Sequence, residues 1–509
     1  MTDIVIGSGP SGVAAAWARL AKGREVLILD GGKELEPDKA SLRDRLAKTG
    51  PQAWRAEDRA AYSAAQTEAP PGQVRRFGSD FAMEPFDSIF AEAQGVALRS
   101  SRAVGGLSNL WGTAVLPFAP SDMQDWPITA EDLAPHYRAV QEILPIRGRQ
   151  DALAPLFPNG LPDTPSPVPP TSQATILLHR FERRAARLSN QGLHVGMARQ
   201  AVAEGCRECG MCLHGCPWGL MWSAAHNLAK VLENSRCRHR PGAIVARLEE
   251  TETGILCHLE NGETLIAERV FLASGVLDTA RILLRSGLTG RDNLELKEAR
   301  HGFLPMLQAA PSWPATDRLP LTTLPQLFAE LKAPDLSPYL IHAQLYGWNE
   351  HYARDLHANY GAKLPGLGWL WPILARRLVV AQIFLHSAHW PSLTLQLAHD
   401  GRLNAQISSD NPAARLLPQA AQRLGKGTRA AGLWALPFAL RFAEAGGSFH
   451  LGSSLPMARN PKLGQSDLLG RPTGQRRLHV VDASVLPAIP ATTITYPVMA
   501  NAHRIAALA

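Results

Sequence analysis

The stretch IVIGSGPSGVAAAWARLAKGREVLILDGG runs from Ile4 to Gly32 and decides the fold of the chain. It predicts an apolar strand, a glycine turn, an alanine-rich helix and a second strand that ends in an acidic residue. A GxGxxG turn between a strand and a helix is typical of dinucleotide sites, because its glycines permit the turn, the approach of backbone to a pyrophosphate and close helix–strand packing. The helix N-terminus presents unpaired N–H groups to the diphosphate, and the terminal carboxylate can bind a ribose. The predicted contacts are Gly7, Gly9, Pro10, Ser11, Gly12, Asp30 and Gly31. The alternative is a glycine turn that serves helix packing alone.

The composition is that of a globular enzyme with two or three domains. The chain has 509 residues, of which 45% are hydrophobic and 19% charged. Its net charge of +7 is too small over this length to indicate a nucleic-acid partner, although peripheral contact with a membrane surface stays open. No apolar run reaches the length of a membrane span. Because the first strand follows Met1 directly and the cysteines are clustered, we expect a cytoplasmic protein without a secretory signal.

A second glycine-rich segment, RAVGGLSNLWGTAVLPF, runs from Arg102 to Phe118. Together with DWPITAEDLAPHYRAV, from Asp125 to Val140, it resembles the glucose-methanol-choline (GMC) oxidoreductases, especially their pyranose-oxidase and sugar-dehydrogenase branches. The resemblance implies FAD as the dinucleotide. Some members attach FAD covalently through a histidine in this loop, where this chain has Leu110, so non-covalent FAD is expected. The loop residues implied at the FAD site are Gly105, Gly106, Ser108, Asn109 and Trp111.

The middle of the chain is expected to return to the nucleotide sheet. From Gly242 the segments GAIVARLEE, GILCHLE and TLIAERVFLAS predict three strands, and a glycine turn and an amphipathic helix follow. In the GMC family the matching segment runs beside the adenosine half of FAD, which implies contacts from Val245 and Gly275. A βα unit without a ligand is the alternative, because this element is common in α/β folds.

Four of the six cysteines lie within eleven residues, in CRECGMCLHGCPWG from Cys206 to Gly219. The spacing C-x2-C-x2-C-x3-C-P is that of the cysteine run that holds iron–sulfur clusters in bacterial ferredoxins. In two-cluster ferredoxins the last cysteine serves the other cluster, so the spacing leaves the ligand set open. The alternatives are a zinc site, whose cysteines usually form two separated pairs, and a reduced thiol cluster without metal. The candidate ligands are Cys206, Cys209, Cys212 and Cys216.

Some GMC dehydrogenases with an iron–sulfur centre have a similar segment, without a cysteine at the position of Cys209. The resemblance therefore implies that Cys209 supplies an additional ligand, which favours [4Fe-4S] over [3Fe-4S]. Cys237 and Cys257 could substitute as ligands, but isolated cysteines are more often buried apolar residues.

The C-terminal segments GGSFHLGSSLPM and LHVVDASVLPAIPATTITYPVMANAHRIA, from Gly446 and Leu478, resemble the closing block of GMC enzymes. Carried over by position, His450 matches the catalytic histidine, and Asp482 and Ala483 match residues that border the FAD diphosphate and ribityl chain. The family usually has a second histidine or an asparagine beside the flavin, where this chain has Thr492 and Thr493. A threonine can form a hydrogen bond but cannot act as an imidazole base.

The predicted fold is α/β: a Rossmann-type FAD domain assembled from N-terminal, middle and C-terminal segments, plus an α+β substrate domain with an antiparallel sheet. The histidines of the substrate domain, including His342 and His386, are interpreted as structural. The predicted boundaries are 1–150 for the first FAD part with an excursion at 33–95, 151–202 for a linker and helix, 203–235 for the cysteine segment, 236–299 for the second FAD part, 300–445 for the substrate domain and 446–509 for the last FAD part.

These features predict an FAD-dependent dehydrogenase of a hydroxyl-bearing small molecule, with a sugar or another secondary alcohol as substrate. His450 would remove the hydroxyl proton while hydride passes to the flavin. The cluster would connect the flavin to an external partner, which could be a cytochrome, a ferredoxin or a quinone. The alternatives are a reductase that runs electrons from the cluster to a carbonyl or double bond, and a redox-sensing flavoprotein without catalysis.

Overall fold

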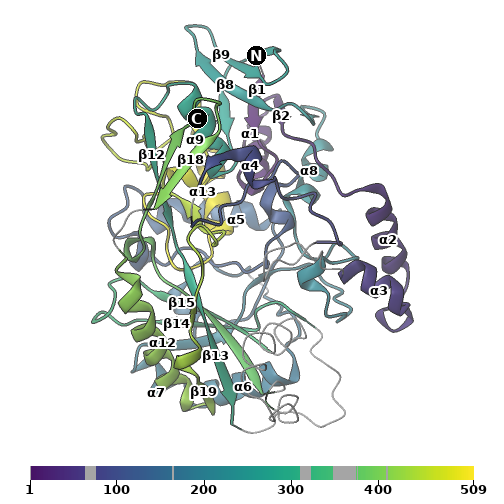
Figure 1. The fold of residues 1–509 in the computed structure, drawn as a ribbon, viewed down its shortest axis with the longest axis vertical. Helices are drawn as coiled ribbons and strands as arrows, with labels where there is room; N and C mark the ends of the chain where they lie inside the picture. Colours follow the sequence, from purple (N-terminus) through teal and green to yellow (C-terminus); the bar gives the residue numbers. More distant parts are fainter. Residues whose placement is uncertain are drawn as a thin grey trace.

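The computed structural model describes residues 2–63, 76–93, 95–162, 165–309, 322–347, 374, 377–407 and 411–509. Figure 1 shows a nucleotide-binding end around β1 and β2, where both termini lie, and a second end around β13, β14 and β15. The chain passes repeatedly between these two ends.

The nucleotide-binding end is built on a sheet with the strand order β22-β11-β1-β2-β7. Its neighbouring strands are all parallel. N-terminal, middle and C-terminal segments each contribute strands, so the predicted Rossmann-type sheet is confirmed. The strands are β1 (Asp3–Ile6), β2 (Val26–Leu29), β7 (Cys237–Arg240), β11 (Val270–Leu272) and β22 (Leu478–Val480).

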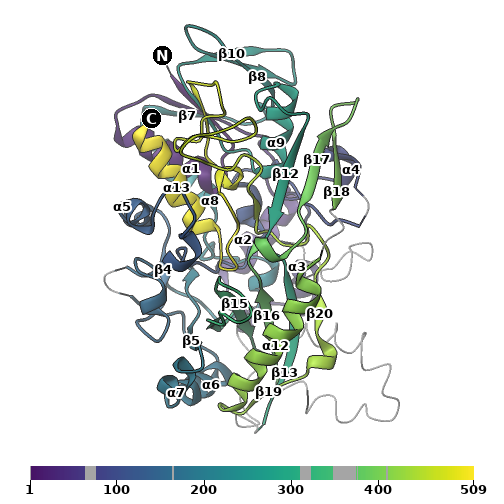
Figure 2. The same ribbon diagram turned by 90° about the vertical axis from the view of Figure 1, so that its left-hand side faces the viewer.

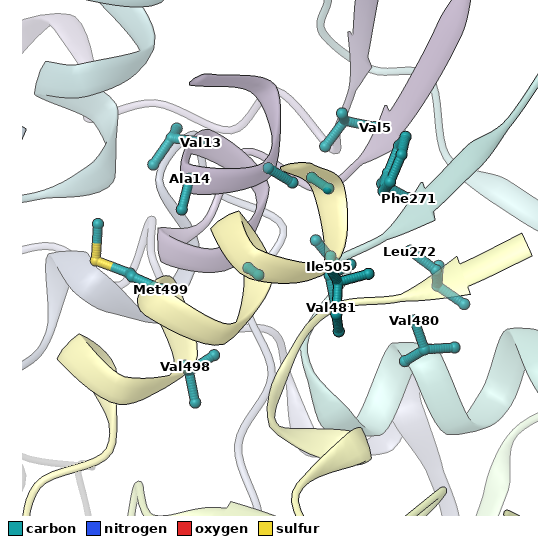
Figure 3. Packing of buried hydrophobic residues seen from close by; sticks show 14 of the residues in the cluster. Val5, Val13, Ala14, Phe271, Leu272, Val480, Val481, Val498, Met499 and Ile505 are labelled. Atoms are coloured by element: carbon teal, nitrogen blue, oxygen red, sulfur yellow. The ribbon is translucent and has the colours of Figure 1, made fainter. Parts of the chain in front are cut away.

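Helices α1 (Pro10–Ala21) and α13 (Thr495–Leu508) pack together beside this sheet. Figure 3 shows the contact, with Val13 on α1 near Met499 on α13. The small side chains of α1 allow the close approach. The buried guanidinium of Arg19 binds the buried Asp3 carboxylate at 2.8 Å and donates to the Ala506 carbonyl at 3.0 Å. This network ties α1 to the first strand and the last helix.

The middle segment differs from its prediction in one respect. β8 (Val245–Glu250), β9 (Ile255–Leu259) and β10 (Thr264–Ala267) form an antiparallel sheet. The expectation of one strand across TLIAERVFLAS was wrong, because the chain leaves this sheet after β10 and enters the nucleotide sheet as β11. The break falls on charged Glu268 and Arg269; Glu268 pairs with Arg24 at 2.5 Å.

The second end carries a sheet with the order β19-β13-β16-β15-β14-β5, and β20 also pairs with β13. Helices α6 (Ser172–Glu182) and α12 (Ala413–Arg429) lie at this end (Figure 2). Their buried side chains share one apolar core with side chains of the sheet. The basic amphipathic pattern of residues 173–188 predicts a single helix, but the structure divides it into α6 and α7 (Ala185–Ser189). The strands are β5 (Leu193–Met197), β13 (His301–Gln308), β14 (Leu327–Leu331), β15 (Ile341–Tyr346), β16 (Leu378–Phe384), β19 (Leu433–Ala435) and β20 (Arg441–Phe442).

A smaller sheet with the order β21-β12-β17-β18-β3 lies between the two ends. The segment SLTLQLAHDGRLNAQIS, with apolar alternation on both sides of Asp400-Gly401, predicts a hairpin. The structure confirms it: β17 and β18 pair antiparallel, and Gly401 in the turn has φ +82°. β12 is followed almost directly by β13, so one chain segment connects this sheet to the substrate sheet. The strands are β3 (Phe90–Glu92), β12 (Asn293–Glu298), β17 (Leu393–Leu397), β18 (Leu403–Ile407) and β21 (Leu451–Gly452).

The excursion after the first βαβ unit contains α2 (Pro37–Lys48) and α3 (Ala56–Ser63). Two further helices flank the nucleotide sheet, α8 (Ala224–Leu232) and α9 (Val276–Arg285). In the described part of the chain, none of the helices combines the length and apolar character that a bilayer span requires.

Replacing Arg19 by methionine should lower the free energy of unfolding by about 3–5 kcal/mol, because the buried Asp3 carboxylate would lose its main partner. Urea unfolding at pH 7 measures the change. Lys22→Met, at the exposed end of the same helix, is the matched control and should stay within about 0.5 kcal/mol of the parent protein. Equal losses in the two variants would contradict a role for this network.

Candidate functional site

A cavity opens at the carboxyl ends of the parallel strands, where open α/β sheets bind their ligands. Segments that follow β1, β2, β11 and β22 all contribute to its wall. The predicted FAD contacts that line it are Gly7, Gly9, Pro10, Ser11, Asp30, Gly31, Gly106, Ser108, Trp111, Val245, Gly275, Asp482 and Ala483.

The glycines of the first turn have different roles. Gly7 has φ +103°, and a β-carbon there would lie 2.3 Å from the Ala273 carbonyl oxygen. A β-carbon at Gly9 would meet no atom within 4 Å, which leaves room for a pyrophosphate beside the start of α1. Gly12 does not line the cavity, and its β-carbon would lie 1.9 Å from the Gly7 carbonyl oxygen. Gly12 thus serves backbone packing within the turn.

Asp30 presents a free carboxylate oxygen at the end of β2. The Ser8 hydroxyl donates a hydrogen bond to Oδ2. Oδ1 is buried without a hydrogen-bond partner, although His239 Nε2 lies 3.1 Å away. An unsatisfied buried carboxylate oxygen is costly, so this atom fits a ligand hydroxyl such as that of a ribose.

The second glycine loop divides in the same way. Gly106, Ser108 and Trp111 face the cavity, whereas Gly105 and Asn109 hold the loop. A β-carbon at Gly105 would lie 2.7 Å from the Ala225 backbone nitrogen. The Asn109 amide donates to two carbonyls of its own loop at 2.8 and 2.9 Å.

The far side of the cavity contains the predicted Asp482 and two polar residues that the motifs did not indicate. Asp278 and Arg281 on α9 form a buried ion pair of 2.5 Å and line the cavity, and Arg281 Nε has no hydrogen-bond partner. Asp482, after β22, accepts hydrogen bonds from the Thr279 hydroxyl and the Ser484 backbone. Burial raises the pKa of Asp482, and these hydrogen bonds oppose the shift. The sequence feature that could have indicated these residues is the charged pair Asp278 and Arg281 within the otherwise apolar segment ASGVLDTARILL.

His450 lies on the loop that leads into β21, next to residues that line the cavity. The buried Glu298 carboxylate anchors this loop by accepting from the backbone nitrogens of Gly446 and Ser448, both at 2.9 Å. The His450 backbone donates to the Ser448 hydroxyl, and its carbonyl accepts from Ala299. His450 does not itself line the cavity. Its ring stacks on Phe384 of the substrate sheet at a centroid distance of 4.9 Å.

A row of side chains crosses the face of the substrate sheet that carries Phe384. In register across four strands are His301 on β13, Phe384 on β16, His342 on β15 and Glu330 on β14. Glu330 Oε1 lies 2.7 Å from His342 Nδ1, and both residues are fully buried. His342 Nε2, His301 Nδ1 and His450 Nδ1 are buried without hydrogen-bond partners. His342, which the sequence analysis interprets as structural, thus lies near His450 at this face.

The imidazoles of His450 and His301 are uncharged at neutral pH. Burial, together with the nearby His301 and His342, lowers the pKa of His450 to about 3. Burial and the charge of Arg300 lower the pKa of His301 to about 3. Burial raises the pKa of Asp122, near Glu330, to about 7. A neutral His450 can accept a hydrogen bond or a proton from a hydroxyl.

Thr492 and Thr493, which stand where the GMC resemblance places a second histidine or an asparagine, have different surroundings. Thr493 Oγ1 accepts a hydrogen bond from the Leu116 backbone at 2.7 Å, whereas the buried Thr492 hydroxyl has no hydrogen-bond partner. Neither lines the FAD cavity. Thr113 is fully buried, has φ +56° and also has an unpartnered hydroxyl. A β-branched residue in the left-handed region is strained, and such strain clusters at functional sites.

Comparison with known proteins agrees with this architecture. Residues 1–301 and 413–502 match the N-terminal and C-terminal parts described as GMC oxidoreductase. The chain belongs to the GMC oxidoreductase family. Members of this family are FAD enzymes that act on CH–OH groups, and the free atoms at Asp30 and the open space at Gly9 fit FAD in the cavity.

Two individual proteins are similar to this GMC chain. The 6'''-hydroxyparomomycin C oxidase of Streptomyces lividus is 26% identical over 301 residues, which are 55% of this chain and 49% of that protein. This chain therefore spans about half the length of that curated relative. The crystal structure of pyridoxine 4-oxidase from Mesorbium loti aligns with a TM-score of 0.59 and 16% identity over 99% of this chain and 98% of the other. At that identity the likeness shows the fold alone.

The four clustered cysteines line a second, mainly apolar cavity together with Trp218 and Met221. Their loop has positive φ at Gly205, Glu208, Gly210, Gly215 and Gly219. These left-handed turns let a short segment face one cavity from several sides. Cys237 and Cys257 are buried in strands of other sheets and do not line it.

The N-terminal excursion packs against the loop that carries the four clustered cysteines. A small apolar cluster joins Leu42, Leu46, Trp54 and Tyr62 to Met211 of the cysteine loop. Trp54 stacks on Trp218 at 5.7 Å, and the Trp218 indole donates to the Ala47 carbonyl at 2.9 Å.

The thiols are not arranged around a single ion. Within the described ranges, no group of three or more His, Cys, Asp or Glu side chains could hold a metal ion. Thiolates bound tetrahedrally to zinc at about 2.3 Å would lie only about 3.8 Å apart. The cysteine cavity therefore differs from a preformed zinc site.

The buried histidines predict an acid-sensitive fold. The unfolded chain takes up protons on histidines near pH 6.5, whereas folded His301 does so only near pH 3. The unfolded state binds more protons between these values, so stability falls as the pH falls, by about 2 kcal/mol per such histidine at pH 5. His301→Phe should reduce the stability lost between pH 7 and pH 5 by about 2 kcal/mol, measured by urea unfolding. His258→Asn, at a more exposed position, is the control; an unchanged pH dependence in His301→Phe would contradict the assignment.

Proposed function

We propose that this GMC oxidoreductase is an FAD-dependent dehydrogenase that oxidises a hydroxyl group and passes electrons through an iron–sulfur cluster to an external acceptor. The proposal rests on the wall shared by the two cavities. Trp111 lines the FAD cavity and Met221 lines the cysteine cavity. Trp222, the neighbour of Met221, packs edge-on against Trp111 with centroids 5.5 Å apart, and the Trp111 indole donates to the Trp222 carbonyl at 2.8 Å.

The short path between the cavities favours electron transfer over a purely structural role for the cysteines. A one-electron centre beside a two-electron flavin provides an outlet to a protein or quinone, so oxygen need not be the oxidant. The acceptor is a cytochrome, a ferredoxin or a quinone, and contact with a quinone would require only peripheral membrane association.

A cluster fits the cysteine cavity better than one ion does. The four thiols face a common space without the close grouping that a single metal requires. A [4Fe-4S] cubane would use all four cysteines, whereas [3Fe-4S] would leave Cys209 free. The density of cysteines favours the cubane.

The protein's own residues account for the proton transfer. FAD supplies a hydride acceptor when it is bound. His450 accepts the hydroxyl proton of the substrate as its carbinol carbon becomes a carbonyl; its imidazole is uncharged at neutral pH, although its lowered pKa makes it a weak base. The Glu298 carboxylate orients the loop that carries His450.

Side chains of the substrate sheet supply the second base that this chain lacks where other members have a histidine or an asparagine. Thr492 and Thr493 can hydrogen-bond a substrate oxygen but cannot store its proton. The His342–Glu330 pair brings a second imidazole and a carboxylate to the same face as His450. Polar side chains on this face suit a sugar or another secondary alcohol, and the name of the Streptomyces lividus relative is also that of an oxidase of a hydroxylated compound.

A visible spectrum of the purified protein, before and after dithionite, tests the cofactor assignment. Broad iron absorption beneath the flavin bands is expected. Anaerobic mixing with candidate sugars and alcohols should bleach the flavin, and an artificial dye should reoxidise the enzyme faster than oxygen does. A flavin without iron, or oxygen turnover faster than dye turnover, would contradict the relay. Reduction of a carbonyl by the dithionite-reduced protein, without the forward reaction, would favour the reverse direction.

Replacing His450 by alanine should slow anaerobic flavin reduction by about 10²–10⁴-fold, because the proton acceptor is lost. Stopped-flow absorbance at the flavin band measures the rate. His389→Ala is the control on the same domain, since its ring bonds Ser337 at 2.9 Å away from this row. Reduction at the parental rate in His450→Ala would exclude His450 as the base.

A further inference from the structure

Arg76 is a buried cation between the two cavities. Its side chain reaches from the end of the N-terminal excursion to the cysteine loop, where Nη1 donates to the Cys212 carbonyl and lies 3.7 Å from Met221 Sδ. Nη2 donates to the Trp111 carbonyl at 2.5 Å. The residue is 5% exposed. One guanidinium thus connects the backbone of the cysteine loop to the loop that lines the FAD cavity.

This cation has no carboxylate partner among the described residues. The nearby groups that can become anionic are the Cys212 and Cys216 thiols and the Tyr62 phenol. Burial raises the pKa of Tyr62 above its usual value, so the phenol stays neutral. Burial lowers the pKa of Arg76 to about 10, and the guanidinium therefore remains charged at neutral pH.

A buried charge without a counter-charge is expensive, by several kcal/mol even after local relaxation. Backbone carbonyls supply hydrogen bonds and partial charges but no net charge. The cysteine cavity can hold the missing negative charge, because the Cys212 and Cys216 thiols that line it interact electrostatically with Arg76. A cluster held by four thiolates carries a net negative charge, which increases on reduction.

We propose that Arg76 is the fixed positive charge that balances the iron–sulfur cluster and favours its reduced state. This inference rests on the proposed function, since it needs a cluster at Cys206, Cys209, Cys212 and Cys216. Arg76 is a positioning and electrostatic residue: it contacts the loops around both cofactors through hydrogen bonds, and it acts on the cluster through its charge. An exposed arginine could not do this as well, because water screens its field.

Redox titration of the cluster in the complete, FAD-loaded protein tests the proposal. At a fixed solution potential, the ratio of reduced to oxidised cluster should fall at least about tenfold in Arg76→Gln and Arg76→Met. This corresponds to a lowering of the midpoint potential by about 59 mV for a one-electron couple. Arg76→Lys keeps the charge and should stay close to the parent protein. Arg207→Gln is the matched control: Arg207 also lines the cysteine cavity, but it is exposed and lies over Trp218 at 5.1 Å. Its shift should be clearly smaller.

Each outcome decides a separate point. An unchanged ratio in Arg76→Gln, or equal shifts in Arg76→Gln and Arg76→Lys, would overturn the charge-balancing role while leaving the relay intact. If Arg76→Gln and Arg76→Met lose iron while Arg76→Lys retains it, the positive charge at this position is required for the cluster to bind, and the charge-balancing role is supported. Loss of iron in all three variants would assign Arg76 a hydrogen-bonding role and overturn the proposal. A parent protein without iron would instead refute the proposed function.

Discussion

The close approach of backbone at Gly7 and Ala273 is the constraint on which the nucleotide end depends. β1 and β11 pair in parallel although they are far apart in sequence, and the first glycine turn crosses directly over the end of β11. Any β-carbon at Gly7 or Gly12 would overlap a backbone oxygen. Because the turn fits, α1 starts at the cavity, and residues after β2 and β22 face the same space. The FAD cavity is therefore a product of this contact as much as of the residues that line it.

The substrate side follows a different principle, which is the burial of several imidazoles near one carboxylate. His450, His301 and His342 gather around Phe384 in a region of low polarity. An imidazolium formed there is costly unless a negative charge is near. Glu330 is the carboxylate in the row across this sheet face, and its bond to His342 fixes the orientation of that ring. A proton taken from a hydroxyl can thus be held on this face without leaving an uncompensated charge.

The parts of this architecture that could be predicted from sequence depend on local patterns. The GxGxxG turn specifies its own strand and helix, and the Asp400-Gly401 turn specifies its hairpin. The break between β10 and β11 was missed because the residues on both sides of Glu268 and Arg269 are apolar and typical of a strand, while the change of sheet is set by partners elsewhere. Glu330 and His342 become neighbours through a register between two strands, and no spacing in the sequence encodes that pairing. Arg76 was invisible for the same reason, since its partners lie more than 30 and more than 130 residues away along the chain.

The N-terminal excursion explains how two cavities from distant segments become one unit. Its helices place Trp54 on Trp218 and fill the space behind the cysteine loop, and the Phe77 ring lies against Gly215, where a β-carbon would be 2.5 Å from the ring. Arg76 then extends from the same segment to the Trp111 loop. Met211 of the cysteine loop belongs to the apolar cluster of the excursion, so the excursion supplies packing that holds the backbone turns of this loop. Since the excursion is anchored by the first βαβ unit, the geometry of the four thiols depends on a correctly folded FAD domain.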